Sequence, residues 1–318
     1  MHSGRPILSV ILPVYNCENY VVQAINCILN QTFDDFELLI ADDGSSDASK
    51  RIIDNYAGQD SRIRVSHNSK NCGKVSTVNR LLGLCKGDYI TVHDSDDFSH
   101  PNRFFRQVEI LQADPALVMC GTSFRAVNEK DVLFSEVIMP GNLKQILSRI
   151  KDASQFHGPT MVIRRAAVTD YLYRPFFDEY NEDCDLVFRL IEKGSCTNLS
   201  EILYTYRIRP NSLSKTVTAR RKNLYKMAVM FHEQRVVHGS DDLMKGESQS
   251  AEAKLARLLE PYRMDPSRIH RENAAFLMYY RLNRAAIVNA MKACMVKPFY
   301  FNNWRTLQYC IRKSYLGI

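Results

Sequence analysis

The chain lacks several features that would place it in common protein classes. None of its nine cysteines forms a CxxC pair or shows metal-finger spacing, and several fall inside apolar segments. No charged-then-apolar signal begins the sequence, and no uncharged run approaches the roughly 20 residues of a membrane span. We therefore expect a cytoplasmic protein with reduced, buried thiols and no transmembrane segment.

Acidic residues become scarce toward the end of the chain. Residues 1–218 carry 24 Lys and Arg against 27 Asp and Glu, whereas residues 219–318 carry 18 against 8. No acid follows Glu272, and the cations there are interleaved with aromatic residues. This composition suits an anionic membrane surface. The alternatives are a solvated helical extension and a homo-oligomer contact. The same composition superficially suits nucleic acid, but no other feature of the sequence indicates nucleic-acid binding.

The first 120 residues alternate apolar strands with amphipathic helices. We expect strands at 7–14, 36–41, 63–66, 89–92 and 117–120, and helices at 20–29, 48–56, 75–85 and 102–113. Repeated βαβ units of this kind predict an α/β fold with a mostly parallel central sheet flanked by helices.

The pattern changes after residue 121. Short strands are expected at 123–127, 132–137, 160–163 and 203–208, with helices at 143–150 and 183–192. We interpret residues 1–218 as one catalytic domain, with a nucleotide-binding half at about 6–121 and an acceptor half at about 122–218. Residues 219–318 should form a basic helical extension, with a flexible link at 240–250 and helices at 251–259 and 273–295.

Three carboxylates follow the strand expected at 89–92. Asp94, Asp96 and Asp97 stand directly at its C-terminal end, where they repel one another unless a cation lies among them. Mg²⁺ or Mn²⁺ bound to a phosphate-bearing ligand is the simplest candidate, because both ions prefer carboxylate and phosphate oxygens. By itself the motif is weak evidence, since acidic turns are common and most are solvated.

Other polar residues fall at the same edge of the sheet, where ligands of α/β proteins bind. Tyr15 can offer its ring to a base, and one carboxylate of the pair Asp42 and Asp43 can accept the N3–H of a pyrimidine. Lys74 is placed to reach a nucleotide phosphate. Asp183, in the first turn of a helix, is suited to act as a general base. Each also has a plainer explanation as a turn, a surface loop or a dipole-compensating acid.

Five motifs in order resemble the family-two glycosyltransferases, which are inverting enzymes with a glycosyltransferase-A fold. They are VILPVYN at 10–16, IADDGSSD at 40–47, GDYI at 87–90, DSDD at 94–97 and NEDCDL at 181–186. The resemblance covers about residues 6–215. On the donor side it implies that Pro13, Tyr15, Asp43, Asp94 and Ser95 bind the nucleotide, and that Asp96 or Asp97 contacts Mn²⁺ or Mg²⁺ at the diphosphate.

The resemblance also assigns residues on the acceptor side. Asp183 would be the catalytic base, Glu182 a supporting group, and His157 part of the acceptor segment. One departure concerns a late motif in which the family usually has a histidine near the metal, where this chain has Arg209. An arginine cannot ligate a metal, but it can pair directly with a departing diphosphate.

The resemblance therefore implies a metal-dependent, inverting glycosyltransferase of the hexosyltransferase type. Its donor would be a nucleotide sugar, with a preference for uridine, and its acceptor a hydroxyl of a glycan or a lipid-linked molecule in bacterial surface polysaccharide synthesis. From the missing signal segment and the basic, aromatic C-terminal composition we expect a cytoplasmic location with peripheral contact to the inner face of the membrane.

Other functions remain open or are disfavoured by missing motifs. A sugar-nucleotide-binding protein without activity and a nucleotidyltransferase are the alternatives that we keep. A pyrophosphorylase-type nucleotidyltransferase would need a glycine-rich phosphate loop near the N-terminus, which is absent. A Rossmann oxidoreductase is disfavoured because PVYN stands where a GxGxxG turn would follow the first strand.

Overall fold

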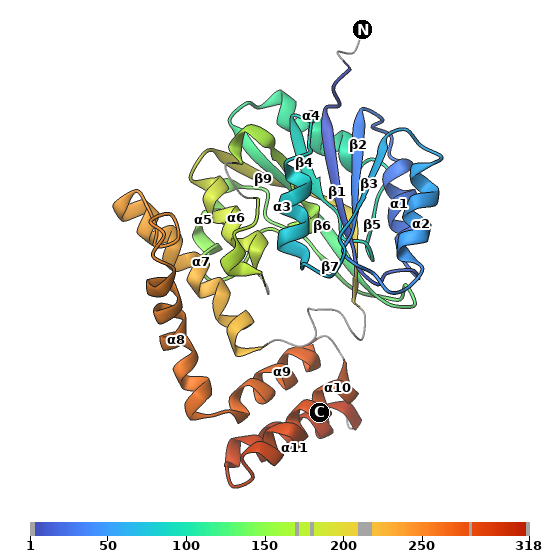
Figure 1. Ribbon diagram of the computed structural model, residues 1–318. Helices are drawn as coiled ribbons and strands as arrows, with labels where there is room; N and C mark the ends of the chain where they lie inside the picture. The colour runs from blue at the N-terminus through green and yellow to red at the C-terminus, as the bar shows by residue number, and fades with distance from the viewer. Residues whose placement is uncertain (1–3, 169–171, 179–180, 209–217, 280–281, 316–318) are drawn as a thin grey trace. The chain divides into compact units, whose positions relative to one another are not determined.

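The computed structural model describes residues 4–168, 172–178, 181–208, 218–279 and 282–315. The chain divides into two compact units, Met1–Ile208 and Arg209–Ile318 (Figure 1). The sequence suggests a division at residue 218, and the interval between these two positions lies mostly outside the described residues.

In the first unit, strands and helices alternate as far as residue 113. The elements are β1 (Leu8–Val14), α1 (Val21–Leu29), β2 (Phe36–Asp42), α2 (Ser49–Ala57), β3 (Ile63–His67), α3 (Lys74–Leu82), β4 (Tyr89–Val92), β5 (Phe98–Ser99) and α4 (Arg103–Ala113). Four of the strands pair side by side in the parallel order β3-β2-β1-β4. The βαβ rhythm of the sequence thus forms at nearly the expected bounds, with the short strand β5 added.

The rest of the unit extends the same sheet. Its elements are β6 (Leu117–Asn128), β7 (Leu133–Val137), α5 (Leu143–Arg149), β8 (Val162–Arg164), α6 (Glu182–Ile191) and β9 (Ser195–Ile208). The sheet continues in the order β4-β8-β6-β9-β5, with β7 paired to β6. Strand β8 is antiparallel to both of its neighbours, whereas β6 and β9 are parallel.

Two strands are longer than the sequence pattern indicates. The strands expected at 117–120 and 123–127 form the single strand β6, and β9 begins well before residue 203. The two strands pair with each other along most of their length, and the register shifts between Thr122 and Ser123. Such an irregularity interrupts the two-residue alternation of apolar side chains, so the pattern reads as two short strands.

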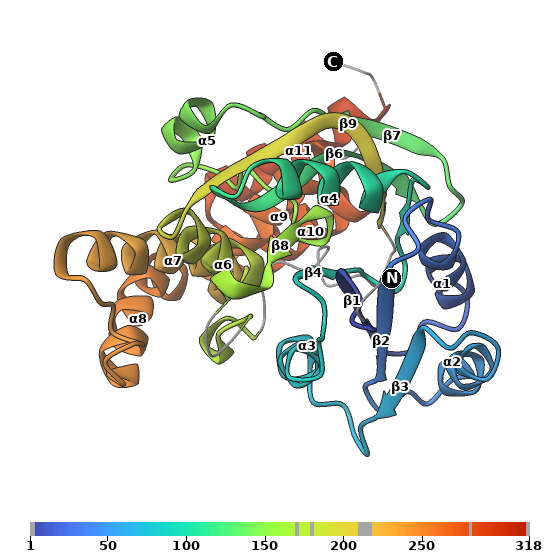
Figure 2. The same cartoon turned by 90° about the horizontal axis from the view of Figure 1, so that it is seen from above.

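Helices cover both faces of the parallel strands. Helices α1 and α2 lie on one face of β1 to β3, and α3 lies on the other (Figure 2). The side chains of β1 and β2 are almost all buried, which explains why these strands read as continuous apolar runs. Helix α4 joins the same core through Phe104, Val108 and Leu111. This layering leaves the C-terminal ends of the strands as a polar edge.

The second unit is helical. It contains α7 (Ala219–His238), α8 (Ser248–Met264), α9 (Ser267–Tyr279), α10 (Asn283–Val296) and α11 (Phe301–Tyr315). The single helix expected at 273–295 is two helices. Ala286 and Ala290 of α10 pack with Ala274 and Leu277 of α9. Both helices therefore carry apolar residues at helical spacing, and in the sequence the two patterns read as one continuous helix. Among the described helices, none is long and apolar enough to cross a membrane.

The segment expected to be a flexible link is instead held by buried ion pairs. Asp241 and Asp242 are buried at the end of α7. Asp241 pairs with Arg235, and Asp242 accepts hydrogen bonds from Gln234 and Lys254. The polar composition that suggests a linker therefore reflects a local network of paired charges, and that expectation was wrong.

Candidate active site

The site begins where β1 and β4 end. In the sheet, β2 pairs with one edge of β1 and β4 pairs with the other edge. Strands that follow β1 in the chain are therefore added on both of its sides, which makes this position a topological switch point. Ligands of open α/β sheets bind in the crevice beyond such a switch point. Tyr15 follows β1 and is about half exposed, whereas Pro13 is inside β1. Ser95 follows β4, and its carbonyl accepts a hydrogen bond from Cys17 Sγ at 3.4 Å.

Asp43 follows β2 and organises the loop before α3. One carboxylate oxygen accepts from Asn68 Nδ2 at 2.6 Å and from the backbone N–H of Cys72 at 2.9 Å, and the other accepts from Gly73 N–H at 2.9 Å. Three of its roughly four acceptor positions are thus used within the protein. Close packing of this loop on Gly44 requires glycine, because a Cβ there would lie 2.6 Å from the Lys70 carbonyl carbon.

Lys74, the first residue of α3, lies between acids from the two halves of the unit. Its Nζ is 2.9 Å from Oδ1 of Asp94 and 3.4 Å from Oε1 of Glu182. Burial opposes its charged form, but attraction to Asp94 and Glu182 raises the pKa of Lys74 well above its ordinary value. Burial likewise opposes ionisation of Asp94, yet Lys74 lowers its pKa, whereas burial raises the pKa of Glu182. One ammonium group therefore joins the predicted donor and acceptor sides.

The adjacent acids Asp96 and Asp97 have different environments. Asp97 is buried, and its two oxygens accept from Tyr204 Oη at 2.9 Å and from the backbone N–H of Arg207 at 2.8 Å. Burial and the neighbouring charges of Asp96 and Asp94 raise the pKa of Asp97 well above its ordinary value. Asp96 is only partly buried. Both oxygens of Asp97 are thus engaged by donors of the protein, whereas the two acids look alike in the sequence.

His157 lies beside Asp183, the predicted catalytic base. Its ring stacks on Phe124 with centroids 4.2 Å apart, and Tyr206 meets it edge-on. Burial lowers the pKa of His157 to about 4, although Asp183 and Asp94 act in the opposite direction. The imidazole is therefore neutral near pH 7. Within the described part of the chain, its buried Nε2 has no hydrogen-bond partner, which is unusual for a polar atom unless it serves a ligand.

Asp183 is in the first turn of α6, directly after Glu182. Its Oδ1 accepts the backbone N–H of Cys184 at 2.9 Å, and its Oδ2 packs against Gly158. Asp185, a fully buried acid of α6, pairs with Arg174 and, at 3.0 Å, with Arg189, and these ion pairs hold the helix in place. The catalytic candidate therefore extends from a rigidly held helix terminus.

Two buried arginines support the site, and the sequence analysis did not identify either. Arg103 donates to Thr91 Oγ1 at 2.8 Å and to the Pro159 carbonyl at 2.7 Å, which ties β4 to the segment that carries His157. Arg207 donates through Nε to the Asp96 carbonyl at 2.9 Å, which fixes the acidic turn. Arg207 stands two positions before Arg209, in the late motif itself, whereas an arginine in an amphipathic helix such as α4 gives no signal. Arg209, the predicted diphosphate partner, lies outside the described residues.

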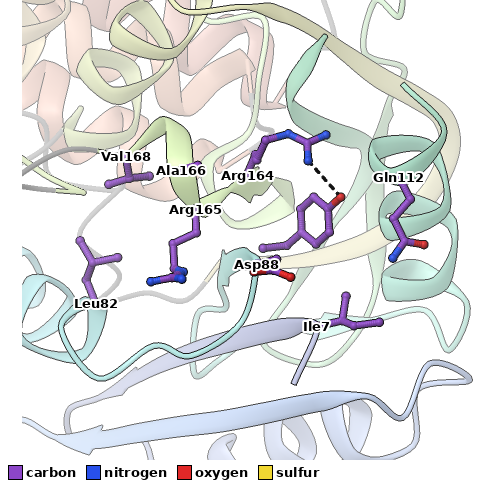
Figure 3. A pocket seen from close by; sticks show the side chains of 9 residues that line it. Ile7, Leu82, Asp88, Gln112, Arg164, Arg165, Ala166 and Val168 are labelled. Carbon is purple, nitrogen blue, oxygen red and sulfur yellow. Dashed lines mark hydrogen bonds between the residues drawn. The ribbon is translucent and has the colours of Figure 1, made fainter. Parts of the chain in front are cut away.

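No group of three or more His, Cys, Asp or Glu side chains within the described ranges converges to hold a metal ion. A pocket of about 590 Å³ lies elsewhere, at the N-terminal ends of β1 and β4 and the C-terminal end of β8 (Figure 3). It is lined in part by Asp88, Arg164 and Arg165, and Arg164 already donates to Tyr89 Oη at 3.3 Å. This pocket is thus separate from the acidic edge.

Comparisons with known proteins agree on one family. The model of Glycosyl transferase family 2 matches residues 9–172. The putative glycosyltransferase EpsE of Bacillus subtilis is 34% identical over 210 residues, which are 65% of this chain and 74% of EpsE. Chondroitin synthase of Escherichia coli is 29% identical over 227 residues, which are 70% of this chain and 32% of the synthase.

Solved structures share the fold at low sequence identity. TarS residues 1–349 of S. aureus in complex with UDP-GlcNAc superposes with a TM-score of 0.61 at 18% identity, over 96% of this chain and 91% of that one. The mannosyltransferase PcManGT of Pyrobaculum calidifontis in complex with GDP-Man and Mn²⁺ gives 0.54 at 15% identity, over 99% and 87%. Together with the family match over more than half of its length, these findings show that the chain belongs to glycosyl transferase family 2 and has a glycosyltransferase-A fold.

Proposed function

We propose that this glycosyltransferase moves a sugar from a nucleotide sugar, UDP-linked by preference, to a hydroxyl of a glycan or lipid-linked acceptor, with inversion at the anomeric carbon. The observation that carries the proposal is the contact of Lys74 with both Asp94 and Glu182, because it joins the predicted donor and acceptor sides in one site. The relatives named for polysaccharide synthesis and the UDP-GlcNAc complex of TarS support the substrate class.

On the donor side, the exposed ring of Tyr15 is available to stack on the base. Asp43 retains an acceptor position for a base N–H, and it also holds the loop that places Lys74. The ammonium group of Lys74 can pair with a phosphate when the donor enters. Pro13, Asp94 and Ser95 complete the proposed nucleotide site at the ends of β1 and β4.

A divalent cation fits the chemistry of this edge. Asp96 is a partly buried carboxylate two positions after Asp94, and Mn²⁺ or Mg²⁺ binds such oxygens together with phosphate oxygens and water. When bound, the cation would neutralise charge that develops on the departing diphosphate. Mn²⁺ in the complex of PcManGT supports this assignment.

On the acceptor side, we assign the catalytic base to Asp183. Its carboxylate takes the proton of the acceptor hydroxyl, whose oxygen then forms the new bond to the anomeric carbon as the bond to the diphosphate breaks. The neutral imidazole of His157 offers its unpartnered Nε2 to a hydroxyl of the acceptor or the donor. Glu182, held by Lys74, orients the first turn of α6.

The test of this assignment separates chemistry from donor binding. Asp183→Asn should lower sugar transfer on the order of 10²–10⁴-fold, because a general base is lost, while UDP affinity measured by calorimetry stays nearly unchanged. Asn also keeps an oxygen for the Cys184 N–H, so folding should be intact. A variant that retains more than about a tenth of the wild-type turnover would remove Asp183 from this role.

A panel of sugar nucleotides tests the enzyme class itself. The wild-type protein should be thermally stabilised by a UDP-sugar in the presence of Mn²⁺, since ligands that bind the native state raise its apparent stability. If it binds the nucleotide sugar but neither transfers nor hydrolyses it with any acceptor tested, the non-catalytic alternative would hold. Release of pyrophosphate from a nucleoside triphosphate and a sugar phosphate would identify a nucleotidyltransferase.

A further inference from the structure

Large apolar side chains are concentrated at the turn between α10 and α11. Phe299 is fully exposed, and Phe301 and Trp304 are 75% and 53% exposed. Met295 and Val296, at the end of α10, are exposed as well. We call the residues from Met295 to Trp304 the aromatic turn. Apolar side chains that form a contiguous solvent-exposed patch usually mark a contact with another molecule or a membrane.

The apolar surface continues along one side of α11. Phe301, Trp304, Ile311 and Tyr315 are exposed, and their spacing of three, seven and four residues places them on one helical face. The buried positions of the same helix are Asn303 and Cys310, which face α9 and α10. Helix α11 thus has two apolar sides, and among the described residues of the second unit only the side of Cys310 is packed against other helices.

Side-chain hydrogen bonds to backbone carbonyls hold the aromatic turn together. Asn303 Nδ2 donates to the carbonyls of Ala293 and Lys297 at 2.9 and 2.8 Å, which caps the end of α10. Trp304 Nε1 donates to the Pro298 carbonyl at 2.6 Å. Polar groups that are already paired cost less to transfer into an apolar environment than free ones. The turn can therefore enter such an environment without being rebuilt.

Most charges around this surface are positive, and the acids that reach it are Asp265, 4.0 Å from Lys297, and Glu272, which lines a pocket with Arg305. Lys292 and Lys297 come from α10 and the turn, and Arg305, Arg312 and Lys313 come from α11. No acidic residue lies anywhere after Glu272. A second copy of the chain would bring the same cations against this surface, and like charges across an interface disfavour association. An anionic bilayer supplies the complementary charge and also accepts aromatic side chains at its interface.

We propose that the aromatic turn and the exposed face of α11 dock this protein onto an anionic lipid bilayer. The apolar side chains of the turn enter the boundary between head groups and acyl chains, and the surrounding cations contact the anionic head groups. This inference stands independently of the proposed reaction, because it depends only on residues of the second unit.

The chain contains a built-in probe of this contact, because Trp304 is its only tryptophan. Addition of vesicles that contain phosphatidylglycerol should shift the emission of the full-length protein to shorter wavelength, and brominated lipids should quench it. Phosphatidylcholine vesicles should have a much weaker effect. A rise in salt from about 50 to 500 mM should release the protein, since electrostatic attraction to the surface is screened.

A pair of double variants makes the test specific. Phe299→Ser with Phe301→Ser should lower the partition onto phosphatidylglycerol vesicles at least about tenfold, as measured by co-sedimentation. The matched control is Val236→Ser with Val237→Ser, which removes two exposed apolar side chains of α7 and should leave binding unchanged. Circular dichroism and UDP binding should be the same for all three proteins.

Three results would overturn the proposal. The first is failure of the wild-type protein to sediment with anionic vesicles at low salt. The second is equal binding to phosphatidylcholine. The third is a dimer in solution that the Phe299→Ser, Phe301→Ser variant converts to a monomer, which would identify a second copy as the occupant of this surface.

Discussion

Gly158 and Asp183 are packed so closely that a Cβ atom at position 158 would lie 2.5 Å from Oδ2 of Asp183. The segment that carries His157 therefore forms one wall of the space around the proposed catalytic base. The Cβ of Asp183 would also lie only 2.8 Å from that atom, so rotation of the carboxylate alone could not relieve the contact. The absence of a side chain at residue 158 is thus a condition for the position of Asp183.

Gly158→Ala should reduce kcat at least about tenfold while changing UDP affinity little, because small displacements of a catalytic group are costly. Kinetics with saturating donor and calorimetry with UDP measure the two quantities. Gly83→Ala is the control: its Cβ would meet only the Arg80 carbonyl at an ordinary 3.6 Å, so its kcat should equal that of the wild type. Equal kcat for both variants would refute the packing argument.

Lys74→Met should change cation and nucleotide affinity in opposite directions. Loss of the ammonium group leaves Asp94 and Glu182 without their counter-charge, so Mn²⁺ alone should bind several-fold more tightly. UDP should bind less tightly, because a phosphate partner is lost. Calorimetry with each ligand distinguishes these effects. Lys50→Met, an exposed lysine of α2, should change neither affinity, and a parallel fall of both affinities in Lys74→Met would point to misfolding instead.

Asp96→Asn and Asp97→Asn should have different consequences although the residues are adjacent. Asp97→Asn places an amide donor against Tyr204 or the Arg207 N–H, so the free energy of unfolding should fall by about 2 kcal/mol. Asp96→Asn should leave stability nearly unchanged and abolish the effect of Mn²⁺ on UDP binding. Urea denaturation and calorimetry with and without EDTA provide the measurements. If Asp97→Asn alone removed the Mn²⁺ effect at unchanged stability, the two roles would be reversed.

His157 should make the fold less stable in mild acid. Its pKa is lowered by burial to about 4, below the ordinary value near 6.5. The unfolded chain therefore binds a proton first, so stability is fully present above pH 6.5 and is lost as the pH falls toward 4. At pH 5 the expected loss is on the order of 2 kcal/mol, which His157→Gln should largely remove. Urea denaturation at pH 8 and pH 5 compares the two proteins, and an identical pH dependence would contradict the prediction.

Apart from the two-residue strand β5, local sequence was sufficient for the strand-and-helix order of the first 120 residues. Buried parallel strands such as β1 and β2 are continuous apolar runs, and the polar motifs that follow them mark the edge where ligands bind. The positions of Tyr15, Asp43, Asp94 and Asp183 at helix and strand ends could be predicted because each depends on its own neighbours along the chain. The family resemblance depended on the same local motifs.

Only the tertiary structure separated the roles of residues that look alike in sequence. Asp96 and Asp97 have the same local context, but the carboxylate of Asp97 accepts hydrogen bonds from Tyr204 and the Arg207 N–H, more than one hundred positions away, whereas the Arg207 side chain donates to the Asp96 carbonyl. The exposed face of α11 likewise became visible only when α9 and α10 covered the opposite face. Hydrogen bonds and packing between distant segments decide which polar groups are satisfied and which remain for a ligand, and no local spacing encodes those partners.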